Sequence, residues 1–102
     1  MPTVTEYIAD ASLPVFYFSK TGCSYCNRLN SDLTELQIPF RVIQLEPADY
    51  ETLFAITKSR TFPQLFINHQ YVGGYTDFSN LCMTNSIATL LAPVGITPVM
   101  NF

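Results

Sequence analysis

Residues 13–19 (LPVFYFS), a continuous run of apolar, aromatic and β-branched character, constrain the fold more than any other segment of this chain. Because its apolar side chains do not alternate with polar ones, a strand here must be buried on both faces, which requires helices on each side of the sheet. The chain has 102 residues, of which 48% are hydrophobic and 13% charged. That length suits one domain with its own core. We therefore expect a single α/β domain over residues 1–102.

Helical and extended segments alternate around this strand. Thr3 and Glu6 fit a capping box that opens a first helix ending near Asp10. Asn68 and His69 suit a tight hairpin turn, because both residue types tolerate a positive φ. Apolar spacing and turn residues predict the remaining elements: a helix over 24–37, a strand over 40–45, a helix from 46 to 57, paired strands over 63–67 and 71–73, and a helix over 76–91.

The order of these elements fixes much of the topology. The helix between the first two strands makes a βαβ unit, so those strands should be parallel. The last two strands should form an antiparallel hairpin. The sequence therefore predicts a four-stranded mixed sheet flanked by helices.

A C-x-x-C pair, Cys23-Ser24-Tyr25-Cys26, lies between the buried strand and the next helix. In a chain with a βαβ pattern, this placement is typical of a thioredoxin-like redox motif. The start of the helix and the nearby Lys20 should both lower the pKa of the Cys23 thiol. Cys26 lies one helical turn further on, within reach of Cys23 and less exposed. We predict that Cys23 is the nucleophile and Cys26 the resolving thiol.

Three other interpretations of the cysteine pair are open at this point. Half a zinc site would need two more ligands, and neither Cys82 nor His69 has a partner at ligand spacing. Two inert core cysteines would not be expected at a turn beside Gly22 and Lys20. A structural disulfide is uncommon in a reducing compartment.

Charge and hydropathy exclude several classes of protein. Five basic and eight acidic residues give a net charge of −3, so a nucleic-acid interface is not expected. The start, MPTVTEYIAD, lacks a basic end and an apolar core, so no signal peptide is expected. No run of 18 apolar residues predicts a membrane span. We expect a cytoplasmic protein with no metal site.

Three separated motifs resemble the glutaredoxins: residues 20–26 (KTGCSYC), 60–68 (RTFPQLFIN) and 73–77 (GGYTD). They occur in the order and at the spacing of that family, and the resemblance covers about 13–91. It implies a thioredoxin-like fold, a cis peptide before Pro63 facing the cysteines, and a groove for glutathione.

The resemblance also implies roles for individual residues. Cys23 takes the glutathionyl sulfur, and Tyr25 flanks it. The main chain of Phe62, beside Thr61 and Pro63, pairs with the glutathione backbone like an added strand.

Four further residues are implied to bind the two charged ends of glutathione. Thr76 and Asp77, at the start of a helix, bind the γ-glutamyl end. Asp77 pairs with the ammonium, and main-chain N–H groups donate hydrogen bonds to the carboxylate. Simple helix capping by Thr76 and Asp77 is compatible with this role. Lys20 and Arg60 pair with the glycyl carboxylate.

The activity implied is glutathione-dependent reduction of protein disulfides and protein–glutathione mixed disulfides, by a monomer, with ribonucleotide reductase as a client. Ser24 stands where many dithiol members carry proline, which resembles the members that hold a [2Fe–2S] cluster between two subunits with glutathione as co-ligand. An iron–sulfur carrier or sensor is therefore the alternative function.

Three features lie outside these motifs. His69 is expected to be a hairpin residue, and Cys82 a packed thiol or, alternatively, half of a regulatory disulfide. Residues 92–102 (APVGITPVMNF) contain two prolines and a glycine, so no helix is expected there. We favour packing of this tail on the protein's own surface over docking to a membrane or a partner.

Overall fold

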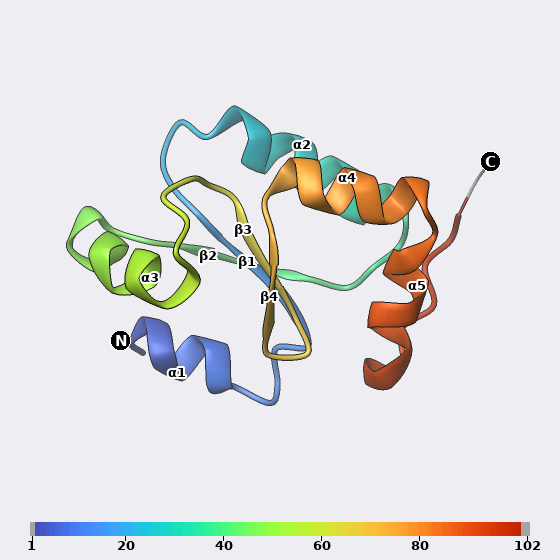
Figure 1. The fold of residues 1–102 in the computed structure, drawn as a ribbon, viewed down its shortest axis with the longest axis horizontal. Helices are drawn as coiled ribbons and strands as arrows, with labels where there is room; N and C mark the ends of the chain where they lie inside the picture. Colours follow the sequence, from blue (N-terminus) through green and yellow to red (C-terminus); the bar gives the residue numbers. More distant parts are fainter. Residues whose placement is uncertain (1, 101–102) are drawn as a thin grey trace.

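A computed structural model describes residues 2–100 and contains one four-stranded sheet (Figure 1). Its strands, in the spatial order β2-β1-β3-β4, are Arg41–Gln44, Val15–Ser19, Gln64–Ile67 and Gln70–Gly73. β1 runs parallel to β2 and antiparallel to β3, and β3 and β4 form an antiparallel hairpin. The predicted mixed sheet is thus confirmed, with its first strand starting two residues later than the apolar run. Asn68 and His69 form the hairpin turn with φ of 53° and 66°.

Helices cover both faces of the sheet (Figure 1). Alternate residues of β1 enter two separate cores, which is why residues 15–18 are all apolar. Val15 and Tyr17 pack with α2 (Ser24–Glu35), α4 (Tyr75–Met83) and α5 (Ser86–Leu91). Phe16 and Phe18 pack with α1 (Val4–Ala9) and α3 (Tyr50–Thr57) on the opposite face.

Two helix boundaries follow directly from local chemistry. The Thr3 hydroxyl accepts from the N–H of Glu6, and the Glu6 carboxylate accepts from the N–H of Thr3, each at 3.2 Å. This is the predicted capping box of α1. α3 follows a 3₁₀ turn (Pro47–Asp49) and ends at Lys58, whose φ of 64° stops the helix.

Two predicted helices are too long. α2 ends at Glu35, and Gln37 has a φ of 56°, which ends the helical path before Pro39. The single helix predicted over 76–91 is wrong, because α4 and α5 are separated at Thr84 and Asn85. Asn85 has a φ of 60°, a conformation that asparagine adopts more readily than most residues. The apolar pattern itself is interrupted there, since the interval from Leu81 to Ile87 is not a helical repeat.

The described part of the tail, residues 92–100, lies on the protein's own core. Val94, Ile96 and Met100 pack against the cluster between the sheet and α2, and the N–H of Val99 donates to the carbonyl of Leu36 at 2.8 Å. This confirms own-surface packing for residues 92–100, whereas residues 101–102 lie outside the described residues. The predicted absence of helix is wrong for the 3₁₀ turn Ala92–Val94.

Within residues 2–100, every helix is too short or too polar to cross a lipid bilayer.

Candidate active site

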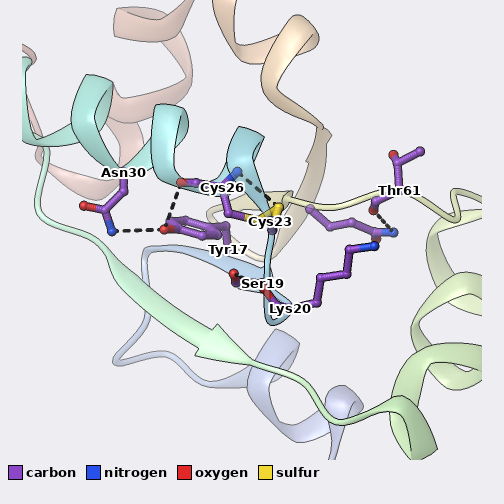
Figure 2. Close-up of a disulfide and its surroundings, with 8 residues drawn as sticks. Tyr17, Ser19, Lys20, Cys23, Cys26, Asn30 and Thr61 are labelled. Atoms are coloured by element: carbon purple, nitrogen blue, oxygen red, sulfur yellow. Dashed lines mark hydrogen bonds between the residues drawn. A yellow bond between two sulfur atoms is a disulfide. The ribbon is translucent and has the colours of Figure 1, made fainter.

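The turn between β1 and α2 places the cysteine pair. Gly22 has a φ of 75°, and Cys23 follows as the N-cap residue of α2. Cys23 and Cys26 form a disulfide with their Cα atoms 5.2 Å apart (Figure 2). Cys23 is half-buried, whereas Cys26 is only 3% exposed. The structure therefore confirms both the predicted pairing and the greater exposure of the first cysteine.

The main chain of α2 is directed at the Cys23 sulfur. The N–H of Cys26 donates to Sγ of Cys23 at 3.2 Å, so a thiolate at this position would be stabilised by the first turn of the helix. Behind the pair, the Tyr17 hydroxyl donates to the Cys26 carbonyl at 3.3 Å and accepts from Asn30 Nδ2 at 3.0 Å (Figure 2). Tyr17 and Asn30 thus support the first turn of α2, a role that their sequence positions do not reveal.

The loop before β3 lies opposite the cysteines and contains the predicted cis peptide between Phe62 and Pro63. Gln64, which is fully buried, donates from Nε2 to the carbonyls of Ser59 at 2.8 Å and Thr61 at 3.0 Å. Its Oε1 has no hydrogen-bond partner among the described residues. Gln64 therefore shapes this loop from beneath, and we did not predict it.

The Phe62 ring packs toward α3. It lies 5.1 Å from the Tyr50 ring and 5.8 Å from the Phe54 ring, measured between centroids. The ammonium of Lys20 lies 5.8 Å from the Phe62 centroid, and Figure 2 shows Lys20 extending toward the loop that carries Thr61. Lys20 therefore reaches the loop opposite the cysteines.

A pocket of about 300 Å³ opens between this loop and the start of α4. Six of the predicted site residues line it: Tyr25, Thr61, Phe62, Pro63, Thr76 and Asp77. Four lining residues were not predicted: Ser59, Tyr71, Gly74 and Tyr75. The structure thus brings Tyr25 of α2 together with residues 59–63 and 71–77, which come much later in the chain.

Lys20 and Arg60 do not line the pocket. Arg60 makes two hydrogen bonds to the Glu51 carboxylate, at 2.9 and 3.1 Å, and this pairing raises the pKa of Arg60. Its guanidinium also lies 5.3 Å from the Phe54 ring centroid. The contacts of Lys20 and Arg60 with the glycyl carboxylate remain predictions.

The first turn of α4 closes the far side of the pocket. The Asp77 carboxylate accepts from the N–H of Gly74 at 3.0 Å, so Asp77 does cap the helix. Its side chain is nevertheless exposed at the pocket. The N–H groups at the start of a helix have no partner within it, which suits this end to an anionic group.

Tyr75 joins α4 to α2. Its hydroxyl donates to Asp32 at 2.7 Å, and this hydrogen bond is the main cause of the raised pKa of Tyr75. The Tyr75 ring lies 6.0 Å from the Tyr25 ring, and the Arg28 guanidinium lies against both. One wall of the pocket is therefore a fixed aromatic pair.

His69 and Cys82 lie away from the cysteine pair. His69 Nδ1 is 2.8 Å from the carbonyl of Ile8, which ties the hairpin to α1. Cys82 lines a smaller cavity between α2 and α4, where burial and the charge of Asp32 raise the pKa of its thiol. Among residues 2–100, no three histidine, cysteine or acidic side chains are grouped as metal ligands.

A C-x-x-C disulfide at the start of a helix, opposite a cis-proline loop, defines a thiol–disulfide redox site on a thioredoxin-like fold. The glutaredoxin family model matches residues 15–72, more than half of the chain, and the chain belongs to the glutaredoxin family. Human mitochondrial glutaredoxin-2 is 31% identical over 83 residues, covering 76% of this chain and 50% of that protein. Glutaredoxin-1 of Saccharomyces cerevisiae is 36% identical over 89 residues, covering 78% and 81% of the two chains.

Solved structures give the same result. A buckwheat glutaredoxin–glutathione complex is 28% identical, with a TM-score of 0.76, and the match covers 82% of this chain and 81% of that one. The chain spans about half the length of several curated relatives that it matches, including the human protein.

Proposed function

We propose that this protein is a glutathione-dependent thiol–disulfide oxidoreductase that acts on protein–glutathione mixed disulfides and protein disulfides. The observation that carries the proposal is the half-buried Cys23, disulfide-bonded to a buried Cys26, beside a pocket whose walls are Tyr25, Pro63 and Asp77. The pocket volume of about 300 Å³ lies at the lower end of the range usual for small-ligand pockets. The similar buckwheat glutaredoxin forms a complex with glutathione, which supports the same ligand here.

Reduction of a glutathionylated client needs only Cys23. The Cys23 thiolate attacks the glutathionyl sulfur, the bond to the client sulfur breaks, and the client leaves as a thiolate. A second glutathione, reacting as its thiolate, then attacks the glutathionyl sulfur on Cys23. Oxidised glutathione leaves and the Cys23 thiolate is regenerated, so electrons balance without a further reductant.

Reduction of a protein disulfide needs both cysteines. Cys23 attacks one client sulfur and forms a mixed disulfide, and the other client sulfur leaves as a thiolate. Cys26 then attacks Cys23, which releases the second client thiolate and forms the disulfide seen in the structure. Two molecules of glutathione reduce this disulfide and leave as oxidised glutathione.

Two single-cysteine variants test the proposal. Cys23→Ser should abolish turnover of both substrate types. Cys26→Ser should retain turnover of a glutathionylated peptide and lose most reduction of a protein disulfide. Turnover of the glutathionylated peptide by Cys23→Ser at the wild-type rate would reject the assignment, and Cys82→Ser provides the control for loss of an unrelated thiol.

A dimer that holds a [2Fe–2S] cluster is the second candidate function. It is favoured by Ser24, which takes the first position of α2 where proline would stiffen the helix start. Two Cys23 thiolates and two glutathione thiolates would supply four sulfur ligands. Anaerobic reconstitution with iron, sulfide and glutathione should give a coloured dimer, whereas a colourless monomer would exclude this function.

The client is proposed on the family resemblance, whereas the compartment and the oligomeric state carry over the expectations drawn from the sequence. We propose a cytoplasmic monomer with ribonucleotide reductase among its clients. Some relatives carry "mitochondrial" in their names, so cell fractionation is the direct test of the compartment. Size-exclusion chromatography tests the monomer, and reactivation of oxidised ribonucleotide reductase by glutathione plus this protein tests the client.

A further inference from the structure

Arg28 on α2 has an acidic residue, Asp32, at the helical spacing where an ion pair is usual. The two side chains do not pair. Asp32 accepts the hydroxyl of Tyr75 at 2.7 Å, and the one ion pair found among residues 2–100 joins Arg60 to Glu51. No carboxylate in the described part of the chain therefore forms an ion pair with Arg28.

Two aromatic rings hold the Arg28 guanidinium in place. Its Cζ lies 5.8 Å from the centroid of Tyr25 and 5.5 Å from that of Tyr75. Stacking on aromatic faces suits the planar guanidinium and leaves its N–H groups at the edge free to donate. The side chain is exposed, so a cation faces solvent against Tyr25, two residues along the chain from Cys23.

The position of Arg28 relative to the pocket indicates which part of a substrate it meets. Tyr25 and Tyr75 line the pocket proposed for glutathione, whereas Arg28 does not. Arg28 lies against these two rings and thus flanks the pocket without forming part of it. In a protein–glutathione mixed disulfide, the group outside the glutathione pocket and next to Cys23 is the client.

We propose that Arg28 binds a carboxylate of the client protein, so that glutathionylated cysteines next to Asp or Glu are the preferred substrates. This inference rests on the proposed function. The protein as a whole carries a net charge of −3, and acidic clients would be repelled at long range. A local cation at the site therefore selects where an acidic client can dock.

Two glutathionylated peptides that differ only in Glu or Gln beside the cysteine provide the test. For the wild-type protein, kcat/KM should be about two- to fivefold higher for the Glu peptide, the range expected of an exposed charge pair. Raising the salt to about 1 M, where the Debye length falls to about 3 Å, should remove the preference. Arg28→Gln should give equal values for the two peptides.

Arg41→Gln is the matched control, because Arg41 is an exposed arginine on the edge strand β2 and its loss changes the net charge equally. This variant should keep the preference, and Arg28→Lys should keep a reduced one. Equal kcat/KM for the two peptides with the wild-type protein, or a full preference in Arg28→Gln, overturns the inference. If Arg28→Gln does not fold, a wild-type preference that persists at high salt overturns it. Absence of turnover with both peptides would contradict the proposed function instead.

Discussion

Gly73 and Asp77 lie so close that a Cβ atom on Gly73 would overlap the Asp77 carboxylate. Gly73 is buried at the end of β4 and has a φ of 134°, a conformation that residues with a side chain rarely adopt. Asp77 is held over it by the hydrogen bond from Gly74. The absence of a side chain at Gly73 therefore sets where the Asp77 carboxylate lies in the pocket.

Gly73→Ala should displace Asp77 and destabilise the protein. Backbone strain alone costs roughly 1–3 kcal/mol, and the overlap adds to it. We expect a lower urea midpoint together with a higher KM for glutathione. Gly74→Ala is the control, because its φ is −94° and its nearest contact would be the Pro63 carbonyl at 3.5 Å. Its stability should stay within about 0.5 kcal/mol of wild type, and equal stability of the two variants would contradict this account.

The sequence predicted those parts of the fold that follow from local periodicity. β1 was recognisable because every residue of the strand is buried, and its four apolar residues alternate between two cores. The break at Asn85 was missed, because the apolar residues on both sides of it were assigned to one helix although the interval from Leu81 to Ile87 is not a helical repeat. The cis peptide before Pro63 was expected from the family resemblance and not from composition or spacing.

The hydrogen bond between Tyr75 and Asp32 should be worth about 1 kcal/mol, since it joins a hydroxyl to a carboxylate in a partly exposed site. A double-mutant cycle with Tyr75→Phe and Asp32→Ala should show a coupling energy of that size in urea unfolding. Glu35 lies on the next turn of the same helix, and Tyr75→Phe with Glu35→Ala should be additive within about 0.3–0.5 kcal/mol. A coupling energy of zero for the first pair would show that the bond contributes nothing in solution.

Only some of the residues that line the pocket were predicted, because local motifs can be recognised in a sequence and contacts between distant residues cannot. Thr76 and Asp77 belong to a short motif that carries its own signal, whereas Tyr75 acts through a partner 43 residues away. Arg60 was expected at the ligand, yet a second carboxylate, Glu51, competes for it from the start of α3. Pairings between distant elements depend on packing, which the order of residues along the chain does not reveal.

Cys82 should react slowly with alkylating reagents near neutral pH. Burial, then the charge of Asp32, raises the pKa of its thiol, so the reactive thiolate is scarce. The same shift should make stability depend on pH. The contribution of Cys82 to stability is fully present below the pKa of its thiol in the unfolded chain, and it is lost as pH rises through the higher pKa of the folded protein. In a Cys23→Ser/Cys26→Ser background, the alkylation rate should therefore reach half its maximum at a higher pH than for a free thiol.

Asp32→Asn removes one of the two causes and should move that half-maximum to lower pH, while Glu35→Gln should leave it in place. Alkylation of Cys82 near neutral pH as fast as a free cysteine would contradict the raised pKa. It would also favour a regulatory role for this thiol.

The tail should contribute measurably to stability. Pro98 is buried, Val94, Ile96 and Met100 pack on the core, and Val99 donates to Leu36. Truncation after Leu91 should therefore cost about 2 kcal/mol or more, given roughly 25 cal/mol for each Å² of apolar surface exposed. At roughly 4–8 °C per kcal/mol for a domain of this size, Tm should fall by at least about 8 °C.

Two point variants test whether the fall in Tm comes from packing of tail side chains and not from loss of chain length. Ile96→Ala removes a side chain that packs on the core and should lower Tm, whereas Thr97 is exposed and Thr97→Ala should leave Tm nearly unchanged. The Cys23-dependent turnover should survive truncation at temperatures well below Tm, because the tail lines neither the pocket nor the disulfide. An unchanged Tm after truncation would mean that the contact with Leu36 does not hold the tail in solution, which would reopen docking to a partner or a membrane as its role.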